Sequence, residues 1–232
     1  MSSGEDRVRQ SAVIYGVAIA SLSWFVLTVL LEHVLAPDLG PARHGISEYA
    51  NARGAAGPLM VAGFLMWAGS LGTTAVIVLR DSLRGRAAMT RVLGSVLSAL
   101  LLIAAVGAVL VAVFPTQESA GRLPLGELES NSGRLHALGS DLIQLCFYPA
   151  VLLSLMLPGP RWFPSVAVAL LVVAVAVAPA LAVLDIDASG ARQRVQLAAG
   201  CGWQFALLAA WRSAAWLPGT APTASGAVPE RD

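Results

Sequence analysis

With 232 residues, a mean hydropathy of +0.71 and 12% charged side chains, the chain is far more apolar than a soluble domain, in which about 25% of residues are charged. This composition excludes an ordinary soluble protein and predicts a polytopic integral membrane protein, with the lipid bilayer as its surroundings. The net charge of +1, with no long basic run, excludes a nucleic-acid partner.

The apolar residues fall into six blocks, each long enough to cross the roughly 30 Å hydrocarbon layer as a helix. They cover residues 11–35, 57–79, 92–114, 134–157, 163–184 and 192–216. The first block is longer than a signal-peptide core of about 7 to 15 residues, so we expect it to be retained. The sequence thus predicts an all-α, six-helix transmembrane domain over residues 11–217. A polar cytoplasmic tail at 1–10 precedes it, and a disordered cytoplasmic tail at 218–232 follows it.

Arginines set the expected orientation. The connection between the second and third blocks carries four of them, Arg80, Arg84, Arg86 and Arg91, against a single acid. Because short arginine-rich connections stay in the cytoplasm, this one and both termini are predicted to be cytoplasmic. The connections before the second, fourth and sixth blocks then face outward. We expect the protein to lie in a bacterial plasma membrane.

The first outward connection, residues 36–56, is rich in side chains that can do chemistry. It contains His44, Ser47 and Glu48 between hydrophobic residues, a density that a simple connector does not need. We therefore take Glu48 as a candidate catalytic group and His44 and Ser47 as candidate substrate contacts. Glu32 and His33, near the end of the first block, are expected to be solvated boundary residues.

The fourth block has one polar face. At about 100° per residue, five side chains fall on one side of this helix, and leucines fall on the other. These five are Arg134, His136, Ser140, Asp141 and Gln144. Asp141 lies roughly 10 Å deeper than Arg134, where an isolated carboxylate costs at least about 2.5 kcal/mol. Asp141 therefore needs a partner, a proton or water, and we take it and His136 as candidate catalytic residues.

The fifth and sixth blocks complete the expected site. Pro179 predicts a kink in the fifth helix. The sixth helix opens with Arg192, Gln193 and Arg194, which we expect to bind substrate. Arginines suit an anionic head group, since a guanidinium binds carboxylate or phosphate with two parallel hydrogen bonds. The two arginines of this helix, together with Arg134, could hold such a group. We predict that Glu48, His136, Asp141 and Arg194 share one cavity open to the outer face.

Four short motifs in this order resemble a known membrane family. They are Ile46-Ser47-Glu48 before the second helix, Phe114-Pro115-Thr116 after the third, His136 opening the fourth and Gln193-Arg194 opening the sixth. This arrangement is similar to that of the family called domain of unknown function number 998, and the resemblance covers residues 11–216. It implies a six-helix membrane bundle and candidate positions, but no activity.

The preferred functional hypothesis is acid-assisted chemistry. Burial in a low-dielectric pocket keeps a carboxylic acid protonated, so Glu48 or Asp141, tuned by His136, could serve as a general acid. A pocket beneath the outer face suits a lipidic or isoprenoid substrate that enters sideways from the bilayer. A terpene-cyclase-like or lipid-modifying enzyme would be one instance.

Three alternatives stay open. Arg134, Asp141, Glu48 and Arg194 could form a purely structural ion-pair network. Asp141 and His136 could relay protons or ions in a transporter component, although no inverted repeat is visible. The protein could also be a non-catalytic assembly subunit. No short metal-ligand motif is present, so we expect no cofactor and no bound metal, and no Gly-x-Ser-x-Gly element supports a serine nucleophile.

Overall fold

The computed structural model describes residues 3–85, 87–119, 122, 130–184 and 188–213. Within these ranges the chain is helical, and the only extended pairing is an isolated bridge between Ser119 and Arg122. The prediction of an all-helical protein is confirmed to this extent. The predicted disordered tail at 218–232 lies outside the described residues, as does residue 217 at the end of the predicted domain.

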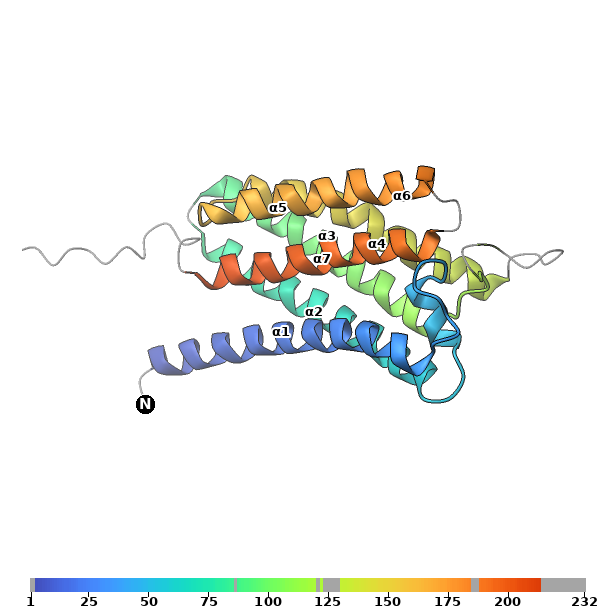
Figure 1. The fold of residues 1–232 in the computed structure, drawn as a ribbon. Coiled ribbons are helices and arrows are strands. Elements are labelled where there is room, and N and C mark those ends of the chain that lie inside the picture. The colour runs from blue at the N-terminus through green and yellow to red at the C-terminus, as the bar shows by residue number, and fades with distance from the viewer. Residues whose placement is uncertain (1–2, 86, 120–121, 123–129, 185–187, 214–232) are drawn as a thin grey trace, which may run out of the picture.

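The chain folds into long helices joined by short connections (Figure 1). They are α1 Ser3–Leu35, the 3-10 helix η1 Ile46–Asn51, α2 Ala56–Arg84, α3 Ala88–Val113, α4 Asn131–Leu155, α5 Trp162–Val172, the π-helical turn η2 Val173–Val177, α6 Ala178–Leu184 and α7 Ser189–Arg212. Helix α1 begins well before the predicted position, although its apolar span is Ser11–Leu35, as expected. The π-helical turn precedes Pro179, which lacks an amide hydrogen and interrupts the regular hydrogen-bond ladder.

Among the residues that the structure describes, five segments are long and apolar enough to cross a membrane: Ser11–Leu35, Ala56–Arg84, Ala88–Val113, Asn131–Leu155 and Trp162–Leu181. The sequence predicted six. Helix α7 differs because Arg192, Gln193, Arg194 and Gln196 lower the hydropathy of its first turns. The coarse result is a membrane protein with several apolar helices.

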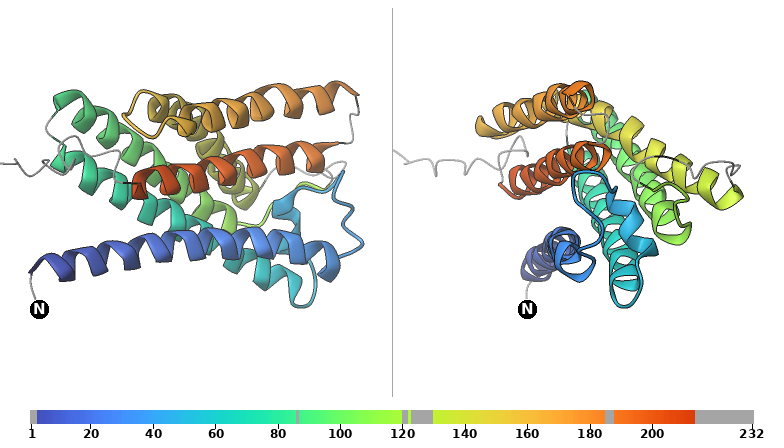
Figure 2. Two further views of the ribbon diagram at one scale, coloured as in Figure 1. Left: turned by 60° about the vertical axis from the view of Figure 1, so that its left-hand side comes forward. Right: turned by 45° about the vertical axis from the view of Figure 1, so that its right-hand side comes forward.

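Helix α7 nevertheless lies inside the bundle, between α1 on one side and the α5–α6 segment on the other (Figures 1 and 2). Buried polar contacts fix it there. The Gln204 side chain accepts a hydrogen bond from Trp67 Nε1 at 3.2 Å and donates to Ser70 Oγ at 2.9 Å and Thr74 Oγ1 at 3.2 Å. Because an amide without partners is costly in an apolar core, this network fixes the register of α7 against α2.

Helices α3 and α4 touch backbone to backbone at a pair of glycines. A Cβ atom on Gly139 would lie 2.7 Å from the carbonyl oxygen of Gly107, and one on Gly107 would lie 2.6 Å from that of Gly139. Only glycine permits this approach. The contact positions α4 just where its polar residues Ser140 and Asp141 begin.

Replacing Gly139 with leucine is expected to destabilise the protein by about 1 to 3 kcal/mol, because the added side chain must push α3 and α4 apart. Gly69 is a matched control, since a Cβ atom there meets nothing within 4 Å. Thermal unfolding in detergent measures the difference. Equal losses in Gly139→Leu and Gly69→Leu would contradict the close packing.

Candidate functional site

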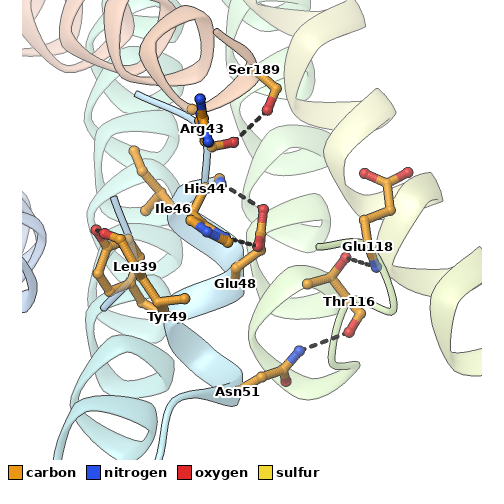
Figure 3. A network of polar contacts seen from close by, with 12 residues as sticks. Leu39, Arg43, His44, Ile46, Glu48, Tyr49, Asn51, Thr116, Glu118 and Ser189 are labelled. Atoms are coloured by element: carbon orange, nitrogen blue, oxygen red, sulfur yellow. Dashed lines mark hydrogen bonds and ion pairs between the residues drawn. The ribbon is translucent and has the colours of Figure 1, made fainter. Parts of the chain in front are cut away.

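One end of the bundle, which we call the loop end, carries the 36–55 loop, the last turn of α1 and the first turns of α4 and α7 (Figure 1). Within the loop, the buried side chain of Glu48 holds the chain in place. One carboxylate oxygen accepts a hydrogen bond from the Gly45 amide at 2.7 Å, and the other lies 2.7 Å from His44 Nδ1 (Figure 3). Two donors on one carboxylate hold the loop in this conformation.

Arg194 is the main link between α7 and this loop. Its Nη1 donates to the carbonyl oxygens of Pro41 at 2.7 Å, His44 at 2.7 Å and Gly190 at 3.0 Å, its Nη2 donates to Tyr49 Oη at 3.1 Å, and its Nε lies 3.1 Å from His33 Nε2. A guanidinium has five donors in a fixed fork, and nearly all are used here. Arg194 therefore has little capacity left for a substrate.

Tyr49 extends the same cluster. Its hydroxyl donates to the carbonyl oxygen of Leu39 at 2.8 Å while it accepts from Arg194. Burial raises the pKa of the Tyr49 hydroxyl above its usual value near 10, with Arg194 opposing that shift. The phenol thus keeps its proton in the physiological range and can donate to Leu39.

The first turn of α7 adds further links to the loop. Ser189 Oγ donates to the Arg43 carbonyl oxygen at 2.5 Å (Figure 3), and the side-chain oxygen of Gln193 accepts from the Ile46 amide. A Cβ atom on Gly190 would lie 2.7 Å from the Pro41 carbonyl oxygen, so only glycine allows this approach. The loop and α7 therefore form one rigid wall.

Beside this wall lies a cavity of about 540 Å³. It is bounded by η1, the segment 116–118, α4, Pro179 of α6, and the start of α7. Eight of the eleven predicted site residues line it: Ser47, Glu48, His136, Ser140, Asp141, Gln144, Arg192 and Gln193. The structure thus brings together side chains that are up to 146 residues apart, from Ser47 in η1 to Gln193 in α7. Their catalytic and binding roles stay predictions.

Three predicted site residues do not line the cavity: His44, Arg134 and Arg194. The expectation that Arg194 shares the cavity with Glu48, His136 and Asp141 does not match its position, because the loop carbonyls engage its guanidinium. His44 is likewise engaged by Glu48. Of the three arginines expected to hold an anionic head group, only Arg192 reaches the cavity.

Asp141 is the most unusual group in the cavity. Its side chain is exposed there and forms no hydrogen bond or ion pair within the described part of the chain. The ion-pair-network alternative required Asp141 to have a partner such as Arg194, which is engaged elsewhere. An unpaired acid on a membrane-spanning helix marks a functional site by default.

His136 and Ser47 offer two further groups to the cavity. His136 Nδ1 lies 2.8 Å from the Phe114 carbonyl oxygen, and since a carbonyl only accepts, Nδ1 carries the hydrogen. Its Nε2 then has no partner among the described residues. Ser47 is only 7% exposed, yet it lines the cavity and its hydroxyl also has no hydrogen-bond partner in the described ranges. Both groups are placed to meet a ligand.

A smaller apolar pocket of about 100 Å³ lies next to the polar cavity. The two spaces share Ser140, Gln144, Gln193 and Gln196. Beyond these residues the pocket is lined mainly by apolar side chains of η1, α2, α3, α4 and α7, among them Ile46, Phe64, Trp67, Val111, Phe147 and Leu197. Sequence reasoning missed this pocket, because apolar residues in apolar helices carry no distinctive signal.

Residues 18–210 match the model of the family described as "Protein of unknown function (DUF998)". The chain belongs to this family. The match confirms the resemblance predicted from the four motifs. The matched range includes all the residues that line the cavity, from Gly45 to Gln196. No curated protein and no solved structure matched the chain.

Proposed function

We propose that this DUF998 protein is a membrane-embedded enzyme that acts on a lipidic or isoprenoid molecule. The observation that carries the proposal is that a polar cavity lies next to an apolar pocket, with four residues of α4 and α7 lining both. A ligand site needs apolar walls and a few convergent polar groups, and an amphiphile would use both. Its head group would occupy the polar space, and the start of its chain would occupy the apolar one.

The chemistry we propose is proton transfer. One of the two carboxyl groups in the cavity, that of Glu48 or that of Asp141, would donate a proton to the bound molecule, and the other, as a carboxylate, would remove one. His136, held through Nδ1, would present Nε2 to the substrate. A positioned acid and base contribute typically 10² to 10⁴-fold each, and they work best where bulk water cannot compete.

The first test is direct. Purified protein in vesicles of bacterial polar lipids is incubated, and the lipids are compared by mass spectrometry before and after. A new lipid product whose amount increases with incubation time and protein concentration supports the enzyme. Unchanged lipids in vesicles of this composition, and in vesicles supplemented with polyprenols, would count against it.

We further propose that α7 is a sixth membrane crossing and that the loop end faces outward. The start of α1 and the end of α7 lie together at the opposite end (Figure 1). Arg80 and Arg84 in the last turns of α2 and Arg91 in the first turn of α3 favour a cytoplasmic location for that end.

Cysteine labelling tests this orientation. In a protein whose two buried cysteines are replaced by alanine, we expect a membrane-impermeant maleimide to label Asp38→Cys in intact cells. Met89→Cys, which is 65% exposed at the other end, should be labelled only after permeabilisation. The reverse pattern would invert the topology.

A transporter is the second candidate, favoured by the unpaired acid Asp141 at membrane depth. In that case, proteoliposomes should show proton or ion flux that Asp141→Asn abolishes, with no change in lipid chemistry. Lipid turnover without flux favours the enzyme.

A further inference from the structure

The charges that line the cavity do not suit the anionic head group expected from the sequence. Three described carboxylates line it, those of Glu48, Glu118 and Asp141, against one guanidinium, that of Arg192. Arg134 and Arg194, the other arginines expected to bind an anion, are not among the lining residues. Three negative charges against one positive charge favour a ligand with a cationic group.

The hydrogen-bonding groups agree with the charges. Asp141 and Glu118 form no side-chain hydrogen bond or ion pair within the part of the chain that the structure describes, and carboxylates only accept. The Ser47 side chain is only 7% exposed and lines this space, and its hydroxyl has no hydrogen-bond partner among the described residues. A ligand in the cavity can supply the hydrogen-bond partner that this hydroxyl lacks among the described residues.

The arrangement suits an organic cation better than a metal ion. Among the described residues, no three His, Cys, Asp or Glu side chains lie close enough together to hold a metal. The three carboxylates come from η1, from the segment after α3 and from α4, and they surround a cavity of about 540 Å³. A primary ammonium has three donors and can be bound by separated acceptors.

Arg192 provides a cationic side chain that can bind a phosphate in the same cavity. It lines the same cavity from the first turn of α7, beside Gln193, and a guanidinium binds phosphate with paired hydrogen bonds. We propose that the cavity selects a phospholipid whose zwitterionic head group carries a primary ammonium next to its phosphate. This inference rests on the proposed function, since it names the class of lipid that the same site takes.

Lipid titration followed by native mass spectrometry tests the proposal. The delipidated full-length protein is titrated with phosphatidylethanolamine, phosphatidylglycerol and diacylglycerol of identical acyl chains. We expect phosphatidylethanolamine to bind about tenfold more tightly than phosphatidylglycerol, since only its head group carries an ammonium that can donate to the carboxylates. Soluble phosphoethanolamine should compete only weakly, because it lacks the chain that enters the apolar pocket.

Variants distinguish the effect of the carboxylates that line the cavity from the effect of charge elsewhere on the surface. Asp141→Asn and Glu118→Gln should each reduce the preference for phosphatidylethanolamine several-fold. Asp38→Asn removes the same charge from an exposed position at the loop end, outside this cavity, and should leave the preference unchanged. Equal effects of Asp141→Asn and Asp38→Asn, or tighter binding of phosphatidylglycerol, would overturn the inference while leaving lipid binding intact. Binding of none of the three lipids would overturn the proposed function as well.

Discussion

Replacing Arg194 with lysine is expected to detach the 36–55 loop from α7 and to lower the free energy of unfolding by roughly 3 kcal/mol. Arginine reaches three carbonyl oxygens, the Tyr49 hydroxyl and a His33 ring nitrogen at once. Lysine keeps the positive charge but concentrates its donors on one atom, so most of these acceptors lose their partner. Thermal unfolding and hydrogen exchange of residues 36–55 measure the loss.

Arg192→Lys is the matched control, two residues earlier on the same helix. Arg192 lines the cavity and its side chain forms no hydrogen bond with the described residues, so this change should leave the loop protected. If Arg194→Lys shows the same protection of the loop as Arg192→Lys, then Arg194 does not organise the loop end.

The second large effect is expected for Asp141→Asn. At saturating lipid, turnover should fall at least about 100-fold, because an amide has nearly the same shape as the carboxyl group but can neither donate nor accept the proton. The melting temperature should change little, since Asp141 has no partner among the described residues to lose. Glu48→Gln should also slow turnover. It should reduce stability as well, because the Glu48 carboxylate oxygens form hydrogen bonds with the His44 ring and the Gly45 amide.

Asp38→Asn controls for the loss of a charge at the same end of the protein. The decisive comparison is between activity and folding. If Asp141→Asn unfolds the protein in proportion to the activity it loses, the carboxylate is structural and the enzyme proposal should be abandoned.

The sequence predicted the polar face of α4 well. Ser140, Asp141 and Gln144 stand out because polar residues are costly in an apolar helix, and all three line the cavity. Arg194 was harder to place. Periodicity locates Arg194 on α7. Its hydrogen bonds to the 36–55 loop depend on how that loop folds back onto α7, and the spacing of residues in the sequence does not predict this fold.

The prediction for Glu32 was wrong. Its position near a helix end suggested a solvated boundary residue, yet it is 1% exposed and its carboxylate oxygens have no hydrogen-bond partner in the described ranges. The loop after α1 covers this helix end and removes it from water. Similarly, Phe64 and Trp67 line the apolar pocket, but their type is ordinary in α2, so only tertiary packing identifies them.

The most direct test of the account is native mass spectrometry of the protein as it leaves the membrane. Ser140 lines both the polar cavity and the apolar pocket, so Ser140→Trp should block their junction. Leu145, 70% exposed on another side of the same helix, provides the control Leu145→Trp. We predict that the wild-type protein and Leu145→Trp retain a bound lipid and that Ser140→Trp does not. Equal lipid retention by Ser140→Trp, or a wild-type protein without bound lipid, would contradict the claim that this cavity is a lipid site.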